Sequence, residues 1–247
     1  MNMSLKKEDL ALTLAQQLRA VTAERQAASR EPALKAARTA LKAYQASRLA
    51  LTHADLLAAA DTRDAARFFL HELYGNDETS QRDADLERIV PTMQRILPPQ
   101  PLHTITQAIV LDALSERLDT AMARTLGPAF TAQEYAAAYR NTCRADRDSQ
   151  LILIKALGDS LADLVRIPFL SVTLGLMRGP ARLAGLGRLQ DFLEQGFGSF
   201  RKVRDPGRFV ALIVSRERML LEQFFRDVTL VAAPDVAGTP VPASSLG

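Results

Sequence analysis

Apolar residues recur about every 3.6 positions along most of the chain, the spacing that places them on one face of an α-helix. No segment shows the strict alternation of apolar and polar residues that a half-buried strand requires. Residues that stop or start helices separate the periodic stretches, among them Glu31-Pro32, Gly127-Pro128 and Asp205-Pro206. The pattern predicts an all-α protein, folded as a single-domain irregular or orthogonal bundle of about eight or nine helices.

The chain divides into three parts by this pattern. The pattern predicts an N-terminal amphipathic helix at residues 1–30, a helical bundle domain at 31–227 and a disordered tail at 228–247. The apolar stripe of the first helix comprises Leu10, Leu14, Leu18 and Val21. We expect the bundle to form around helices at 68–74, 86–97, 105–122 and 209–225. The last of these is apolar on nearly two faces, so we expect it at the centre. The N-terminal helix is expected to be an outlying arm or a surface for a protein partner or for homo-oligomer formation.

Composition excludes several classes of protein. At 247 residues and 47% hydrophobic, the chain can bury a sizeable core, which excludes wholesale disorder. The 31 basic and 28 acidic residues leave a net charge of only +3. This excess is too small for the strongly positive surface of a dedicated nucleic-acid-binding protein. One cysteine excludes a disulfide framework and a cysteine-based zinc site. No apolar run is long enough for a membrane span and no secretory signal is visible, so we expect a cytoplasmic protein.

Two neighbouring stretches carry a resemblance to a known family. Residues 68–75 read FFLHELYG, and residues 82–91 read RDADLERIVP. Together they resemble an uncharacterised bacterial family of helical proteins with an FFLxxLYG…RDxxxxRIxP signature. The resemblance covers roughly residues 35–227, and the chain departs from the family pattern at Glu78, where an aspartate is expected. The resemblance implies an all-helical fold and no activity, so it assigns no catalytic residues.

The densest polar cluster surrounds the first of these stretches. Two of its members, His71 and Tyr74, are spaced to share one helix face. An arginine pair around an aspartate would bind a carboxylate or phosphate through planar guanidinium groups. The alternative is a capping and salt-bridge network that holds the turn between Gly75 and Ser80. The candidate ligand-binding residues are His71, Tyr74, Arg82, Asp83, Arg88, Arg216 and Glu217.

Arg216 and Glu217 are included because they interrupt an apolar helix. At least one of them is expected to face inward, and a buried charge must be paired. Our hypothesis is that one of them pairs with Arg82, Asp83 or Arg88 in a buried network. The alternative is an internal ion-pair network that binds no ligand.

No cofactor or metal site is predicted. The three histidines, His53, His71 and His103, lack the repeated Glu-x-x-His pattern of di-iron bundles. Glu116 and Asp119 lie one helical turn apart, but no histidine accompanies them. Haem needs only one axial histidine and an apolar pocket, so the sequence leaves it open. The strongest basic run comprises Arg201, Lys202, Arg204 and Arg208. These residues are weak candidates for nucleic-acid binding, and the alternative is a solvated loop.

These observations favour a non-enzymatic binding or regulatory module for a protein partner or a small ligand. The absence of nucleophile, phosphate-loop and dinucleotide motifs is the main reason. The first alternative is a cofactor- or metabolite-binding enzyme with an internal pocket near His71, Tyr74 and Arg88. The second alternative is nucleic-acid binding through the basic region at 178–208.

Overall fold

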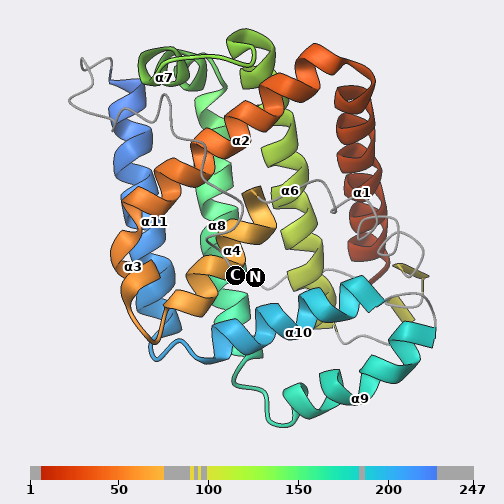
Figure 1. Ribbon diagram of the computed structural model, residues 1–247. Coiled ribbons are helices and arrows are strands. Elements are labelled where there is room, and N and C mark those ends of the chain that lie inside the picture. The colour runs from red at the N-terminus through yellow and green to blue at the C-terminus, as the bar shows by residue number, and fades with distance from the viewer. Residues whose placement is uncertain (1–6, 75–89, 92–93, 96–98, 184–186, 227–247) are drawn as a thin grey trace, which may run out of the picture.

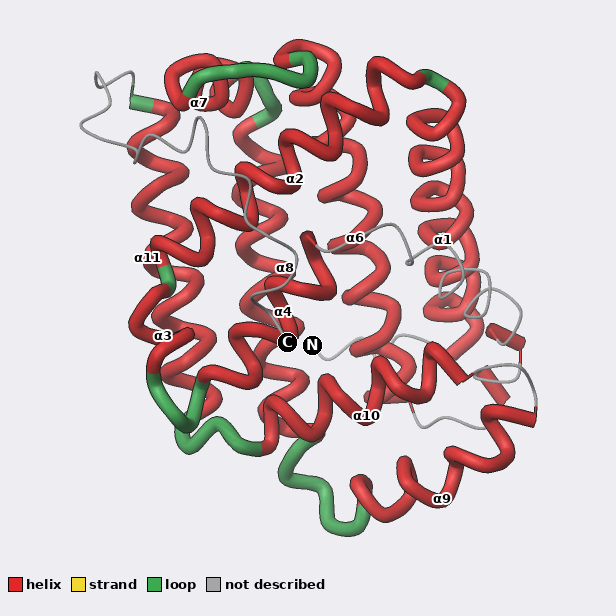
Figure 2. Tube along the Cα trace, viewed as in Figure 1, coloured by secondary structure: helices red, strands yellow, loops and turns green. Residues whose placement is uncertain are grey.

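The computed structural model describes residues 7–74, 90–91, 94–95, 99–183 and 187–226. Within these ranges the chain forms ten labelled helices and no strand (Figures 1 and 2), which confirms the predicted all-α class. The helices are α1 Lys7–Arg30, α2 Pro32–Thr52, α3 Ala54–Ala58, α4 Arg63–Tyr74, α6 Pro99–Leu126, α7 Ala132–Arg140, α8 Arg144–Leu164, α9 Leu170–Leu183, α10 Gly187–Arg201 and α11 Pro206–Phe225.

The longest helix, α6, is the central element of the bundle. It packs against α1, α2, α7 and α8, and α8 in turn packs against α11 (Figure 1). We expected α11 at the centre because it is apolar on nearly two faces, and this was wrong. α11 lies at the side of the bundle and leaves Met219 59% exposed. Apolar content therefore did not distinguish the central helix from a peripheral one.

The helix ends follow the local chemistry of their first residues. The Thr131 hydroxyl accepts a hydrogen bond from the Glu134 backbone N–H, and the Glu134 carboxylate accepts one from the Thr131 N–H in return. Asp205 caps α11 in the same way by accepting the Arg208 N–H, with Pro206 in the first turn. The helix start predicted at Asp205-Pro206 is confirmed. The capping network expected at the turn between Gly75 and Ser80 lies outside the described residues.

The N-terminal helix is part of the bundle rather than an arm. Its predicted stripe is buried, and Leu14 and Leu18 share a core cluster with Leu102 and Ile109 of α6. The face that we assigned to a protein partner is therefore covered by α6. The long apolar stripe was identified correctly, but its neighbour belongs to the same chain.

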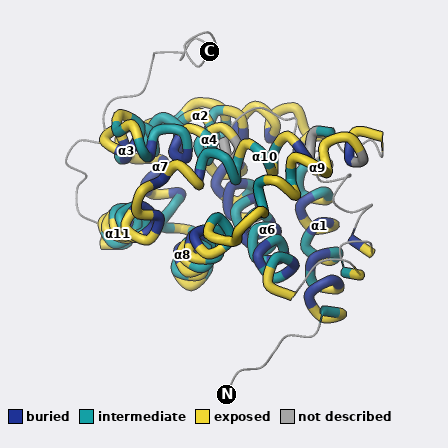
Figure 3. Tube along the Cα trace, turned by 90° about the horizontal axis from the view of Figure 1, so that it is seen from below, coloured by how far each residue is buried: buried dark blue, intermediate teal, exposed yellow. Residues whose placement is uncertain are grey.

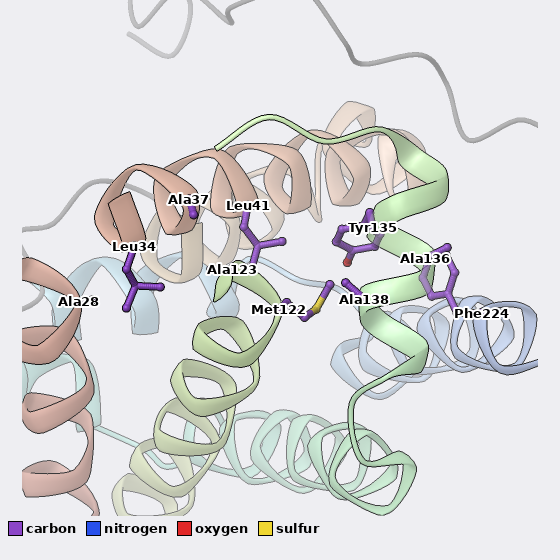
Figure 4. Close-up of a cluster of buried hydrophobic side chains, with 10 residues drawn as sticks. All are labelled: Ala28, Leu34, Ala37, Leu41, Met122, Ala123, Tyr135, Ala136, Ala138 and Phe224. Atoms are coloured by element: carbon purple, nitrogen blue, oxygen red, sulfur yellow. The ribbon is translucent and has the colours of Figure 1, made fainter. Parts of the chain in front are cut away.

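A second core cluster joins α2, α6, α7 and α11 around aromatic rings (Figure 4). Tyr135 is 1% exposed, and its ring lies 4.6 Å from that of Tyr44 and 5.7 Å from that of Phe224, measured between centroids. Such tilted and edge-on pairs contribute beyond their buried area. The third cluster includes Phe200, Val203, Phe209 and Val210, and it fixes α10 and α11 against α8.

The contact between α8 and α11 depends on the absence of a side chain at Gly158. A Cβ atom there would lie 2.5 and 2.6 Å from the two methyl carbons of Val210. Since valine has few rotamers in a helix, we expect Gly158→Ala to lower the free energy of unfolding by about 1–3 kcal/mol. Urea denaturation measures this change. In the matched control, Gly198→Ala, an added Cβ meets nothing within 4 Å. Equal stability of the two variants would contradict the prediction.

Candidate functional site

An open groove of about 460 Å³ lies between α4 and α10 and contains one of the predicted residues, His71. On α4 its wall carries Asp64, Arg67 and His71, spaced to share one helix face. On α10 the opposite wall includes Ser199 and Lys202. Both walls carry charged or polar side chains, and Phe68 adds an apolar surface between them.

Close approach of the two helices is possible because Gly196 of α10 faces Phe68 of α4. An added Cβ at Gly196 would lie 2.8 Å from the Phe68 ring. Phe68 also contacts Phe192, with ring centroids 5.4 Å apart. The FFLxxLYG stretch thus supplies the aromatic packing between α4 and α10. Phe68 and Phe69 of this stretch have a structural explanation in this packing, since Phe69 also lies 6.0 Å from Phe200 of α10 between ring centroids.

Charges in the groove are largely paired within the chain. Lys202 Nζ lies 2.6 Å from an Asp64 carboxylate oxygen. Glu194 accepts hydrogen bonds from Arg178 and Gln190, and these bonds, that of Arg178 first, hold the pKa of its carboxyl at about 2. Both walls therefore carry cations and anions together. The groove is not an electropositive pocket of the kind that attracts a strongly anionic ligand.

The other members of the predicted polar cluster are only partly described. Tyr74 is the last residue of α4, but its side chain lies outside the described part of the structure, as do Arg82, Asp83 and Arg88. Their grouping with His71 remains a prediction. Among the described candidates, His71 is separate from Arg216 and Glu217, which do not line the groove.

Glu217 faces inward as expected for one member of the Arg216-Glu217 pair. Its carboxylate lies 2.8 Å from the Arg48 guanidinium and 3.1 Å from His53 Nε2. Arg216 instead binds Asp55 through two hydrogen bonds and donates a third to the Thr52 carbonyl. The described partners therefore come from α2, α3 and the turn between them. Pairing with residues 82, 83 or 88 lies outside the described residues.

The Glu217 carboxyl shows how these partners act. Burial alone would raise its pKa above the ordinary value of 4.5. The hydrogen bond from His53 and the charge and hydrogen bond of Arg48 outweigh this effect and lower the pKa to about 2. Glu217 is therefore ionised and fully engaged at neutral pH. This arrangement is a structural ion pair that links α2 to α11.

A second buried network, around Glu116, was not predicted as such. The Glu116 carboxylate is 3% exposed and pairs with Arg25, Arg38 and Lys42, which come from α1 and α2. Arg25 also lies 3.0 Å from Asp112. The sequence places two carboxylates, Glu116 and Asp119, one helical turn apart, but it does not indicate which cations pair with Glu116. Burial, then the nearby Arg38 charge, lowers the pKa of the Lys42 amine.

Much of α9 is exposed, as the colouring in Figure 3 shows, and several of its exposed residues are apolar. Spacings of four, three and four residues place Val172, Leu176, Gly179 and Leu183 on one face. Of these side chains, Val172 is 55% exposed, Leu176 74% and Leu183 92%. Phe169, just before α9, is 79% exposed and has a φ of 63°, which is unusual for a bulky residue. We call Phe169, Val172, Leu176, Gly179 and Leu183 the α9 ridge.

The side of α9 that faces the protein includes Ala181, which is 8% exposed, while the Arg178 and Arg182 side chains are 53% and 63% exposed. Arg178 binds Glu194 of α10, Arg182 Nη2 lies 3.9 Å from Asp191, and the Leu174 carbonyl accepts a hydrogen bond from Gln190. Gly175 and Gly179 make no close contact with the rest of the described chain, because a Cβ at either position would meet nothing within 4 Å. No described part of the chain covers the α9 ridge.

The basic run at 201–208 is exposed, and part of it is neutralised. Lys202 pairs with Asp64, and Arg201 donates to the Ser171 hydroxyl at 3.1 Å. Arg204 and Arg208 are exposed at the turn before α11 and within its first turn. The structure gathers these cations at one end of the molecule, beside several carboxylates. Nucleic-acid binding through them remains a prediction.

The described residues contain no cluster of metal-binding side chains, since no group of three or more histidine, cysteine, aspartate or glutamate side chains among them is placed to hold a metal ion. No helix in the same ranges is both long enough and apolar enough to span a membrane. Cys143, the one cysteine, is exposed at the start of α8.

Comparison with known proteins yields a family but no activity. No curated protein and no solved structure matches the chain. One family model spans most of its length, which confirms the expected membership of an uncharacterised family. That family is described as Domain of unknown function (DUF8198), its model matches residues 24–229, and the chain belongs to it.

Proposed function

We propose that this protein is a non-enzymatic, cytoplasmic binding module that engages a partner through the α9 ridge. The observation that carries the proposal is the apolar face that α9 leaves exposed. Ala181 of α9 is buried, while Val172, Leu176 and Leu183, on another face of the helix, are 55%, 74% and 92% exposed. Single exposed apolar residues are common on proteins, but a contiguous set on one helix face marks an interaction surface.

The other surfaces support a binding function less well. The α4–α10 groove is open, and its carboxylates Asp64 and Glu194 are already paired with cations of the same chain. The remaining exposed large apolar residues in the described ranges lie one each on five different helices, and they are Leu12, Leu51, Ile152, Leu193 and Met219. Only α9, together with the turn before it, concentrates such residues. A partner there would remove apolar area from water, which stabilises association in proportion to that area.

Site-specific photo-crosslinking in the producing cell tests this proposal. A photoreactive amino acid at Leu176 is expected to trap a protein partner, giving a covalent product heavier than the chain. The same residue placed at Ile152, which is 62% exposed on α8, is the matched control and is expected to give little product. Equal yields at both positions, or no product at 176, would overturn the proposal.

A further inference from the structure

We infer that Lys42 is a nucleophilic lysine, at which this chain takes up an acyl group from an activated donor such as an acyl phosphate. Lys42 belongs to α2, which lies far from α9 in Figure 1, so its chemistry is independent of the proposed function. Its side chain is 21% exposed, and its Nζ lies 3.2 Å from the Glu116 carboxylate of α6. Lys155 and Lys202, by contrast, have side chains 57% and 64% exposed. Lys42 is therefore an enclosed amine that solvent still reaches.

Lys42 shares its carboxylate with two guanidinium groups. Arg25 of α1 and Arg38 of α2 also pair with Glu116, and the side chains of Arg38 and Glu116 are only 7% and 4% exposed. One carboxylate carries a single negative charge, so it cannot neutralise three cations. Of the three, only the lysine gives up its proton readily, because guanidinium groups stay protonated in proteins. The cluster therefore favours a neutral amine at Lys42.

Charges beyond Glu116 act on the amine in both directions. Asp112 and Asp119 of α6 favour its charged form. Burial opposes them most strongly and the Arg38 charge comes second, so the pKa of the Lys42 amine is lowered from its ordinary value of 10.5. The charge of Arg25 acts in the same direction as that of Arg38. The geometry and the charges thus agree on which form of the side chain gains.

A neutral lysine amine is a nucleophile, and burial beside other cations is one of the ways in which proteins activate it. In the acylation step the Nζ lone pair attacks the carbonyl carbon of the donor, and a C–N bond forms. The C–O bond to the phosphate breaks, the phosphate leaves with the electron pair, and the nitrogen loses a proton to water. The amide that results keeps one N–H that can donate to Glu116. It carries no charge, so Glu116 then serves Arg25 and Arg38 alone.

Acetylation of the full chain by acetyl phosphate tests the inference, with the rate at each lysine measured by mass spectrometry after digestion. The matched controls are Lys155, which pairs with a single carboxylate, and Lys35, which is exposed on the same helix as Lys42. Exposure alone predicts that Lys42 reacts more slowly than Lys155. We expect the opposite at pH 7, with Lys42 acetylated at least about threefold faster than either control. A Lys42 rate that does not exceed both control rates would overturn the inference.

The pH dependence of the rates identifies the cause of that excess. As pH rises toward 10.5, the ordinary value for lysine, exposed lysines also lose their protons, and the excess at Lys42 should disappear. An excess that stays constant with pH would reflect access to the reagent rather than the charge of the amine. That result would also overturn the inference.

Two variants test the contribution of the neighbouring charge. Arg38→Met removes a guanidinium and leaves Glu116 with fewer cations, so Lys42 should be acetylated more slowly relative to Lys155. Arg124→Met removes an arginine that is 53% exposed and pairs with Glu31, and it should leave the ratio unchanged. An unchanged ratio in folded Arg38→Met would overturn the role of the charge cluster. If that variant does not fold, an NMR titration of the natural chain with isotope-labelled lysine decides, since Lys42 should titrate at lower pH than the other lysines. A Lys42 midpoint at or above theirs would overturn the inference.

Discussion

Replacing Glu116 by alanine is expected to lower the free energy of unfolding by about 3–5 kcal/mol. The reason is that this one carboxylate pairs with three cations. Arg38 has a side chain only 7% exposed and pairs with Glu116, while Arg25 and Lys42 lie within 3.2 Å of the same oxygen. Without Glu116, Asp112 remains beside Arg25 and the Thr120 hydroxyl remains beside Arg38, but the buried Arg38 guanidinium loses the carboxylate with which it pairs. A buried charge that loses its counter-ion is strongly destabilising.

Urea denaturation of the purified chain measures this effect as a shift in midpoint at unchanged slope. Asp159→Ala provides the control, because Asp159 forms a surface pair with Lys155 in which both side chains are at least half exposed. Such surface pairs contribute about 0–1 kcal/mol. A Glu116→Ala midpoint close to that of Asp159→Ala would contradict the assignment of Glu116 as the central anion of this network.

Glu217→Gln is expected to lower the free energy of unfolding by about 3 kcal/mol at pH 7, with a loss that shrinks in acid. The folded pKa of about 2 lies below the ordinary value of 4.5, so the ionised carboxylate stabilises the folded state. This contribution is complete above pH 4.5 and disappears as pH falls through about 2. Unfolding measured for both proteins between pH 7 and pH 2 should show the two stabilities converging. A difference that stays constant with pH would contradict the prediction.

The partner of Glu217 can be identified by a double-mutant cycle. Arg48→Met removes the guanidinium that lies 2.8 Å from the carboxylate. If the two groups interact as the structure shows, the double variant should be more stable than the sum of the single losses implies. Additive losses would mean that Arg48 does not stabilise Glu217.

Helix positions could be predicted from the sequence because they depend on local chemistry. The apolar period, the Thr131 capping box and the Asp205-Pro206 start are all set by residues a few positions apart. The stripe at Leu10, Leu14 and Leu18 was buried as predicted. Its covering helix, α6, is about 90 residues away in the chain, and no local pattern identifies such a neighbour.

Two features could not be predicted, for related reasons. The apolar stripe of α9 has the same period as a buried stripe, so periodicity alone assigns it to the core. Its exposure follows from long-range packing, because α9 contacts α10 through another face, where Ala181 is buried. Likewise, Glu116 and its cations are brought together only by the packing of α1 and α2 on α6. Both features are products of long-range contacts.

The central claim is that the α9 ridge is covered by a partner when the protein functions. Carbene footprinting measures this directly, by comparing labelling in intact producing cells with labelling of the dilute purified chain. We predict that Leu176 and Leu183 are labelled in the dilute chain and protected in cells, while Ile152 is labelled alike in both. Equal labelling of Leu176 and Leu183 in both settings would contradict the claim.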